Sequence, residues 1–212
     1  MKPFRLSRRD MLEKCSAAGL LTVAAPLSGV RAAAFWAEGE RLAHKPTPAT
    51  VLGPFFKKSA PQSDALRRAG DPGIPLIVSG KIIGVRGEAL PEARVDVWHA
   101  DYLGHYDIAG YRFRGRLPLT SSGDYKYVTV MPGHYPDRVC QHIHYMISAP
   151  GHKTLVTQLY FATDSVFQGD PDKNFHKDPL ITSRELVRPV TLIGDPKEVE
   201  AAVTFEICLE GV

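Results

Sequence analysis

Short stretches of alternating or continuous apolar residues, separated by turn residues, dominate the sequence after residue 75. Seven such stretches predict β-strands at 76–85, 93–100, 124–131, 142–148, 154–161, 187–194 and 202–210. The segments between them carry Gly, Pro or acidic residues, which favour turns. No long helical pattern interrupts the series. The sequence therefore predicts an all-β fold, an antiparallel β-sandwich of about seven or more strands.

The segment before these strands has a different composition. Residues 35–75 are rich in Pro, Ala and charged residues, and their only compact apolar stretch is GPFF at 53–56. We interpret this segment as an irregular N-terminal arm that wraps the domain, and residues 76–212 as the sandwich domain. The 178 residues after position 34 are enough for one domain with a proper core and too few for two.

The first 34 residues have the pattern of an export signal. Arg8 and Arg9 precede an apolar stretch at 17–30, which is followed by small residues at 32–34. This order resembles the twin-arginine type, so we expect residues 1–34 to be removed and the mature chain to be periplasmic or secreted. The apolar stretch is short and broken by a proline and a glycine, so no stable membrane insertion is expected after processing. A helical cap on the domain is the alternative.

Removal of this leader changes the charge balance. The whole chain has 26 basic and 23 acidic residues and a formal net charge of +3. The leader holds six of the basic and two of the acidic residues, which leaves 20 against 21 and a net charge of −1. Nucleic-acid binding then has no support in the composition.

Two of the three cysteines, Cys140 and Cys208, follow the leader. Two thiols in an oxidising compartment can form a disulfide, but the sequence leaves open whether these two lie close enough. Neither belongs to a C-x-x-C motif, which argues against a thiol redox site.

The predicted strand at 142–148 carries the first chemical signal. His142 and His144 alternate with apolar residues, so both imidazoles project from one face of the strand, about 7 Å apart. Such a pair can bind a metal ion. The alternative is a pair of core or edge histidines that make only hydrogen bonds.

Two tyrosines stand in predicted loops near these histidines. Tyr106 follows the strand at 93–100, and Tyr135 lies in the turn before His142. A tyrosine on a loop is usually a packing residue, but these two and the histidines form a candidate set of two phenolates and two imidazoles. Phenolate is a hard anionic ligand, so two phenolates favour trivalent iron, whereas a structural zinc would use thiolates or more imidazoles.

From about residue 76 to the C-terminus, the chain resembles the intradiol ring-cleaving dioxygenases, which include protocatechuate 3,4-dioxygenase and catechol 1,2-dioxygenase. The resemblance rests on an ordered series of segments: ALPEARVDVWHADYLGHYD, FRGRLPLTSSGDYKYVTVMPGHYP, HIH and TQLYF. It implies a non-haem Fe(III) cofactor, with a small aromatic diol and O2 as partners. The implied reaction opens the ring of a protocatechuate, catechol or hydroxyquinol-like diol to a muconate-type product.

The resemblance also implies roles for single residues. Tyr106, Tyr135, His142 and His144 would bind the iron, and Tyr135 would leave it when the substrate arrives. Gln158, in TQLYF, would lie beside the substrate and shape the electrostatics around its ring. Related enzymes often assemble from several chains, so a homo- or hetero-oligomer is compatible with the resemblance.

One position departs from the family's pattern. The family commonly has an arginine three residues before the H-x-H pair, where this chain has Val139, and Arg138 lies one residue earlier. A local bulge would bring Arg138 into a catalytic position beside the substrate; without it, Arg138 would be an ordinary surface arginine. The run RFRGR at 112–116 leaves a similar choice between a solvated loop face and an arginine that binds a ring carboxylate.

Two other functions remain open at this point. The displaced arginine would suit a sandwich that binds catechols without turnover, which would bind catechol stoichiometrically and consume no O2. A metal-free, transthyretin-like structural sandwich would pack against another protein and would contain no iron when purified from its own host.

Overall fold

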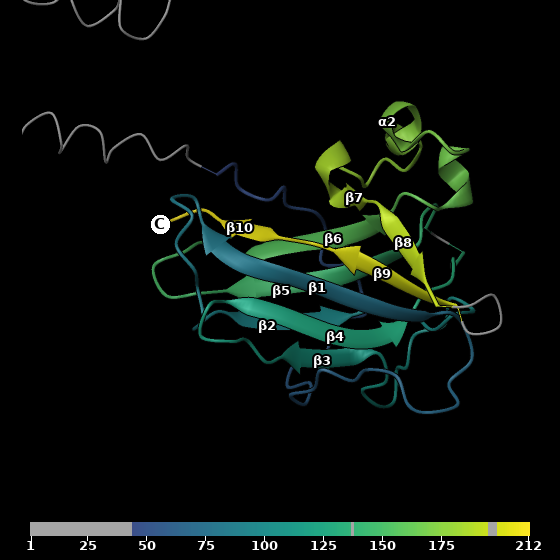
Figure 1. Ribbon diagram of the computed structural model, residues 1–212, viewed down its shortest axis with the longest axis horizontal. Helices are drawn as coiled ribbons and strands as arrows, with labels where there is room; N and C mark the ends of the chain where they lie inside the picture. Colours follow the sequence, from purple (N-terminus) through teal and green to yellow (C-terminus); the bar gives the residue numbers. More distant parts are fainter. Residues whose placement is uncertain (1–43, 137, 195–198) are drawn as a thin grey trace, which may run out of the picture. The chain divides into compact units, whose positions relative to one another are not determined.

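The computed structural model describes residues 44–136, 138–194 and 199–212. Ten β-strands fall within these ranges, and they form two five-stranded sheets that lie face to face (Figure 1). The predicted β-sandwich is therefore confirmed. The predicted export signal at 1–34 and the first part of the arm lie outside the described residues.

The first sheet is built around the long strand β1 (Pro75–Gly84), which pairs antiparallel with β4 (Asp124–Val130). Strand β9 (Glu200–Thr204) pairs parallel with the first half of β1, and β10 (Ile207–Leu209) pairs parallel with its last residues. Strand β8 (Val190–Ile193) lies antiparallel to β9 and ends the sheet on that side.

The second sheet contains the two histidines and has the order β3-β2-β5-β6-β7. Its central strand β5 (His142–Ser148) pairs antiparallel with β2 (Arg94–Trp98) and with β6 (Leu155–Phe161). Strand β3 (Arg114–Leu117) pairs antiparallel with β2, and β7 (Val187–Arg188) pairs parallel with β6. Both sheets are thus mixed, whereas the prediction was purely antiparallel. The sequence pattern could not reveal this, because it indicates which face of a strand is buried and not which way the strand runs.

The strand boundaries differ from the prediction in three places. The stretch predicted at 187–194 divides into β7 and β8 at Pro189, which has no N–H for a sheet hydrogen bond. The stretch predicted at 202–210 divides into β9 and β10. Strand β3 lies outside the predicted set because its sequence, RGRL, has only one apolar side chain.

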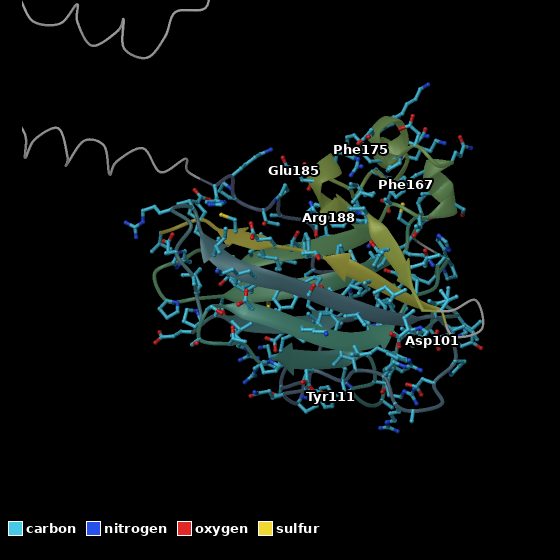
Figure 2. All side chains as sticks on the ribbon, viewed as in Figure 1. Asp101, Tyr111, Phe167, Phe175, Glu185 and Arg188 are labelled. Atoms are coloured by element: carbon cyan, nitrogen blue, oxygen red, sulfur yellow. The ribbon has the colours of Figure 1, made fainter. Side chains whose placement is uncertain are left out.

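A short helical segment connects β6 to β7. It consists of helix α2 (Pro171–Asn174) and three single-turn 3-10 helices at Ser165–Phe167, Phe175–Lys177 and Arg184–Leu186. Phe167 of this segment is fully buried in the core, and Phe175 packs against the same core (Figure 2). Within the described part of the chain, no helix is long and apolar enough to cross a membrane.

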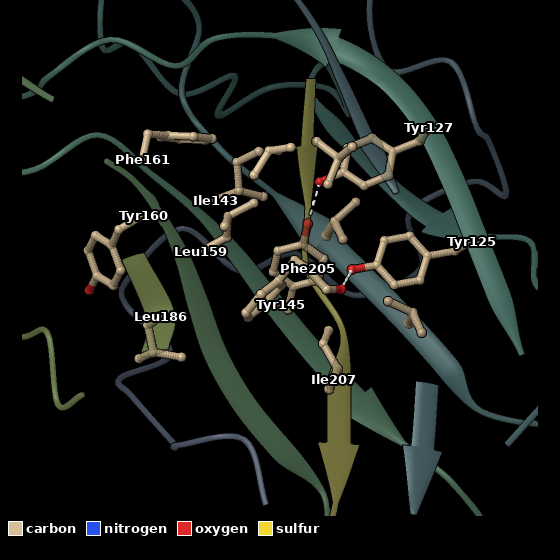
Figure 3. Packing of buried hydrophobic residues seen from close by; sticks show 14 of the residues in the cluster. Tyr125, Tyr127, Ile143, Tyr145, Leu159, Tyr160, Phe161, Leu186, Phe205 and Ile207 are labelled. Carbon is tan, nitrogen blue, oxygen red and sulfur yellow. Dashed lines mark hydrogen bonds between the residues drawn. The ribbon is translucent and has the colours of Figure 1, made fainter. Parts of the chain in front are cut away.

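The main core lies between the two sheets. Tyr145 of β5 is fully buried there and its hydroxyl hydrogen-bonds the hydroxyl of Tyr127 at 2.6 Å (Figure 3). Tyr125 donates to the carbonyl oxygen of Phe205 at 2.5 Å, so the polar atoms of these core tyrosines are satisfied. Since neighbouring side chains of a strand face opposite ways, His144 lies on the other face of β5.

The arm runs beside β6. Within residues 44–74 there is no helix or strand, only isolated bridges at Gln62 and Ala65. The backbone N–H of Thr50 donates to the carbonyl of Val156 at 2.9 Å, and the hydroxyl of Thr157 donates to the carbonyl of Pro48 at 2.7 Å. These bonds fix residues 48–50 next to the strand that carries Gln158.

The two cysteines after the leader are both free and buried. Cys140 precedes β5 in the second sheet, whereas Cys208 lies in β10 of the first sheet. Burial raises the pKa of each thiol above its ordinary value, which makes the reactive thiolate scarce at neutral pH.

Candidate metal centre

The imidazoles of His142 and His144 converge on one point. Their Nε2 atoms are 3.1 Å apart, and both side chains are almost completely buried. Nδ1 of His142 donates to the carbonyl of Cys140 at 2.8 Å, which makes its Nε2 an acceptor. Burial is the main reason why the pKa of His142 falls to about 3 and that of His144 lies well below its ordinary value. Both imidazoles are therefore neutral at pH 7, which is the form that binds metal ions.

Packing holds the ring of His144 in place. The ring stacks on the indole of Trp98, with centroids 4.9 Å apart and an interplanar angle of 6°. On the arm, Gly53 has a positive φ of 70°, and a Cβ atom there would lie 3.1 Å from Cε1 of the imidazole. Nδ1 of His144 has no hydrogen-bond partner among the described residues. The orientation of the His144 ring therefore depends on its packing against Trp98 and Gly53.

The two tyrosines lie beside the histidine pair. The hydroxyl of Tyr135 is 3.2 Å from Nε2 of His142, and its ring packs edge-on against that of Tyr106 at 5.4 Å. The hydroxyl of Tyr106 is buried and has no hydrogen-bond partner in the described structure. Burial, reinforced by the neighbouring Tyr135, raises the pKa of Tyr106 far above its ordinary value. A cation beside this hydroxyl would reverse the shift, because it stabilises the phenolate.

These four side chains fit a metal ion of high charge. The buried hydroxyl of Tyr106 has no partner among the described residues, and such a group is costly in an apolar environment unless a partner meets it. The residues described here contain no group of three or more His, Cys, Asp or Glu that could hold a metal. The set of Tyr106, Tyr135, His142 and His144 differs from such groups because half of its donors are phenols. Its metal-binding role stays a prediction.

Arg138 lies inside the site, whereas Val139 faces solvent. Nη1 of Arg138 is 3.0 Å from Nε2 of His142, and its Nη2 donates to Oε1 of Gln158 at 2.9 Å and to the hydroxyl of Tyr160 at 3.0 Å. The side chain of Arg138 is 7% exposed, against 42% for Val139. This burial rules out the interpretation of Arg138 as an ordinary surface arginine. The catalytic role of Arg138 stays a prediction.

Gln158 connects the arginine to the arm. In the pairing of β5 with β6 it stands opposite His144, so both side chains share a face of the sheet. Its Oε1 accepts from Arg138 and from Tyr160, while its Nε2 donates to the carbonyl of Val51 at 2.8 Å. These bonds fix the orientation of the amide. Asp178 is buried 3.6 Å from Nη2 of Arg138 and balances its charge.

A cavity of about 420 Å³ opens beside these residues. Tyr106, Tyr135 and Arg138 line it, and the remaining wall includes Phe55, which stacks on Tyr106 with ring centroids 4.1 Å apart. The GPFF stretch of the arm is therefore part of the site, a role that the sequence prediction missed. Its signal was present, since GPFF is the only compact apolar stretch of the arm.

The arginines at 112–116 are bound to other parts of the protein. Arg114 is buried, so the interpretation as a solvated loop face is wrong for this residue. None of the three lines the cavity beside the histidine pair. Their partners are protein groups: Arg112 with Asp71 at 2.7 Å, Arg114 with the carbonyls of Phe55 and Asp107, and Arg116 with Asp96 at 3.5 Å.

Comparison with known proteins agrees with this geometry. Residues 51–211 match the dioxygenase family model, which covers both sheets and the site. This chain belongs to the intradiol dioxygenase family. The matched range begins within the arm, at the residue whose carbonyl receives the hydrogen bond of Gln158.

Two curated members of the intradiol dioxygenase family are similar to this chain. Catechol 1,2-dioxygenase 2 of Acinetobacter lwoffii is 31% identical over 58% of this chain and 54% of its own length. Hydroxyquinol 1,2-dioxygenase of Nocardioides simplex is 33% identical over 66% of this chain and 55% of its own length. The matched part of this chain thus spans about half the length of these relatives.

A solved structure extends the comparison to the fold of this chain. It is the dioxygenase domain of a dioxygenase and carbohydrate-binding protein fusion from Streptomyces sp. SirexAA-E. The two structures superpose with a TM-score of 0.66 and 32% sequence identity, over 79% of this chain and 100% of that domain. The whole of that domain therefore matches a part of this chain.

Proposed function

We propose that this chain is a non-haem Fe(III) intradiol dioxygenase that opens the ring of catechol-type aromatics with O2. The observation that carries the proposal is the convergence of two imidazole nitrogens and two tyrosines beside a largely apolar cavity, in a chain of this family. The alternative of a binding protein without turnover was favoured by a displaced arginine. Arg138 lies in the site, which removes that support.

Four residues would hold the iron: Tyr106, Tyr135, His142 and His144. Bound Fe(III) would act as a Lewis acid that takes both oxygens of the diol and makes the ring reactive toward O2. Protein side chains would supply the rest of the chemistry.

Tyr135, held as a phenolate by the metal, would take a proton from the diol as it leaves the metal. Its hydroxyl oxygen lies at the cavity wall, 3.2 Å from Nε2 of His142, so a diol bound beside the histidines would be within its reach. The guanidinium of Arg138 lies on the same histidine and carries a positive charge in a buried environment. It would stabilise negative charge that develops on the ring, where the low dielectric strengthens the interaction. Gln158 holds Arg138 through Oε1 and would also face the substrate.

The proposed reaction consumes equal amounts of diol and O2. The carbon–carbon bond between the two hydroxylated carbons breaks, and both oxygen atoms of O2 enter the two new carboxyl groups of a muconate-type product. The apolar walls of the cavity would exclude water from this reaction.

The visible absorption spectrum of the purified protein, with total iron measured on the same sample, tests the proposal. We expect a broad tyrosinate-to-iron band that shifts when catechol is added without O2, and equal consumption of catechol and O2 when air is admitted. A protein that stays colourless after iron is supplied during folding would overturn the proposal. Bound catechol without O2 uptake would identify a binding protein instead.

We further propose that residues 1–34 direct export through the twin-arginine route and are then removed. Arg8 and Arg9, the apolar stretch behind them and the small residues at 32–34 support this proposal. The mass and N-terminal sequence of the protein recovered from the periplasm or the medium test it. An Arg8→Lys, Arg9→Lys double variant should accumulate inside the cell with its leader, and unchanged export of this variant would contradict the proposal.

A further inference from the structure

A second cavity lies beside the arginine run at 112–116, whose arginines do not line the cavity of the metal centre. Its volume is about 430 Å³, and Arg68, Arg112 and Arg114 line it. We call it the arginine cavity. Arg68 belongs to the arm, Arg112 to the loop before β3, and Arg114 is the first residue of β3. Arginines from three segments thus line one cavity that lies outside the metal centre.

Arg114 brings a buried positive charge to this cavity. Its side chain is 3% exposed. Nη1 and Nη2 donate to the carbonyl oxygens of Phe55 and Asp107, and Nε has no hydrogen-bond partner among the described residues. Burial lowers the pKa of Arg114 below its ordinary value, because desolvation disfavours the charged form. A buried cation whose hydrogen bonds go to uncharged groups would be stabilised by an anion at the cavity wall.

The other two arginines are accessible. Arg68 is exposed, and its main-chain N–H donates to the carboxylate of Asp71 at 2.8 Å. Arg112 gives one nitrogen, Nη2, to the same carboxylate at 2.7 Å, and its side chain is 40% exposed. Asp71 thus balances one of the three positive charges, and a ligand in the cavity can reach both guanidinium groups.

The acidic group at the cavity is turned to its own loop. Among the described residues that line the cavity, Asp107 is the only Asp or Glu. Its Oδ2 accepts from the N–H of Arg112 at 2.9 Å, and its Oδ1 accepts from the N–H groups of Ala109 and Gly110 at 3.1 and 2.7 Å. These bonds hold the pKa of Asp107 below its ordinary value, so it stays ionised. The lining therefore keeps an excess of positive charge.

Apolar side chains complete the lining. Pro61, Leu66 and Tyr111 also line the cavity, and Tyr111 is 40% exposed. The volume of about 430 Å³ lies in the range of about 300 to 1,000 Å³ that is typical of sites for organic ligands. An inorganic anion would use the charge and leave the apolar surface uncovered. A carboxylate on an apolar body matches both parts of the lining.

Arg114 also connects the two cavities. It donates to the carbonyl of Phe55, whose side chain lines the cavity of the metal centre. Two sources of an organic carboxylate suit this place. One is an aromatic acid, and the other is the ring-opened dicarboxylate that the proposed reaction would form.

We propose that the arginine cavity is a binding site for a small organic carboxylate, separate from the metal centre. Arg68 and Arg112 would contact the carboxylate, the charge of Arg114 would stabilise it, and Tyr111 would pack against its apolar body. The site contains none of the predicted iron ligands, so the inference goes beyond the proposed function.

Two carboxylates test the inference: benzoate and cis,cis-muconate. Each is titrated calorimetrically into the iron-loaded protein without O2, in the absence and in the presence of saturating catechol, which would fill the cavity of the metal centre. We expect one molecule of at least one probe to bind per chain in both conditions, and the tighter probe identifies the source. Sulfate should bind about tenfold or more weakly, because it has no apolar body. Binding of neither probe, or equally tight binding of sulfate, would overturn the inference.

Substitution of Arg68 tests the location of the site. Arg68→Gln should weaken binding of the tighter probe by about tenfold, and Arg68→Lys should weaken it less because the charge remains. Arg86→Gln is the matched control, since Arg86 is 83% exposed and does not line the arginine cavity. Its affinity should stay within about twofold of the wild-type value. Equal affinities in Arg68→Gln and Arg86→Gln would contradict the site. Binding that is lost in Arg138→Gln but kept in Arg68→Gln would place the ligand in the metal centre and overturn the inference.

The proposed function and this inference fail in different ways. If the iron-loaded protein consumes no catechol but binds a carboxylate in a manner that depends on Arg68, the proposed function fails and the inference stands. If catechol is cleaved and neither carboxylate binds, the proposed function stands and the inference is wrong.

Discussion

Gly53 of the arm lies against the imidazole of His144, so that a Cβ atom at residue 53 would stand 3.1 Å from Cε1 of the ring. Gly53 also has a positive φ of 70°, a conformation that other residues adopt at a cost. Two reasons thus require glycine here, one from the backbone and one from the contact with the histidine. The contact connects a segment without regular structure to a predicted metal ligand.

Gly53→Ala should therefore weaken iron binding as well as stability. We expect the backbone strain to lower the free energy of unfolding by about 1 kcal/mol, and the displaced imidazole to lower iron affinity by about tenfold. Chemical denaturation and a competition titration with a chelator measure the two effects. Gly70→Ala is the control, because Gly70 has a φ of 83° and nothing within 4 Å of its added Cβ. Equal iron affinity in both variants would show that the contact with His144 is unimportant.

Arg138→Gln should impair turnover more than metal binding. Removal of the buried charge is expected to lower kcat/KM for catechol by about a hundredfold or more, since the negative charge on the ring loses its partner. The iron content should stay unchanged, because the four ligands remain. Arg112→Gln removes an arginine whose ion pair with Asp71 is more exposed and lies outside the lining of the metal-centre cavity, and it should keep kcat/KM within about twofold. If Arg138→Gln retains full activity per iron, the guanidinium has no catalytic role.

Tyr106→Phe should weaken metal binding without lowering the stability of the metal-free protein. Its hydroxyl is buried without a partner, so its removal should leave the metal-free protein as stable as before or slightly more stable. The affinity for Fe(III) should fall by more than about tenfold, and the visible band should change. Tyr127→Phe provides the contrast, because it deletes the hydrogen bond to Tyr145 and should cost about 1 kcal/mol without affecting iron. Wild-type iron affinity in Tyr106→Phe would remove this residue from the ligand set.

The buried side chain of His99 should make the protein less stable in weak acid. The side chain is fully buried, with Nδ1 2.6 Å from the carbonyl of Ala100 and Nε2 2.7 Å from the hydroxyl of Thr129. Burial lowers the pKa of His99 from 6.5 to about 4. Below about pH 6.5 the unfolded chain therefore takes up a proton that the folded chain refuses until about pH 4. The free energy of unfolding should fall across this window by roughly 3 kcal/mol from this group.

The comparison of wild type with His99→Gln isolates this effect from the other buried histidines. His142 and His144 remain buried in both proteins, and burial is the main cause of their lowered pKa, so most of their contribution cancels in the difference. Chemical denaturation of the metal-free proteins between pH 7 and pH 4 should show a steeper decline for wild type. Parallel curves would mean that His99 does not resist protonation in the folded state.

The histidine pair and the sandwich could be predicted because both depend on local periodicity. Alternation along 142–148 identified the shared face of His142 and His144, and turn residues separated most of the strands. The parallel pairing of β9 and β10 with β1 could not be predicted, because alternation is the same for either strand direction. Strand β3 was missed because one of its buried side chains is the charged Arg114, which donates to the carbonyl oxygens of Phe55 and Asp107.

The position of Arg138 could be resolved only by long-range contacts. The sequence places Arg138 one residue earlier than the family's arginine, and local rules allow either orientation. The decisive partners, Gln158 and Tyr160, lie on β6, and Asp178 comes from the helical segment after that strand. The role of Phe55 was hidden for the same reason, since its partner Tyr106 is remote in sequence.

The way in which the arm is attached has a consequence for how such a site can diversify. Thr50 and Val51 dock through main-chain N–H and C=O groups, which every amino acid except proline supplies in full. Substitution of the Val51 side chain would therefore leave the docking intact while it alters what the cavity accepts. The side chains that would hold the metal come from the sandwich and its loops, so a substitution of Val51 would leave them in place, unlike a substitution of Gly53, which lies against His144. New substrate ranges can thus arise by point mutation in a peripheral segment, at little cost to the chemistry.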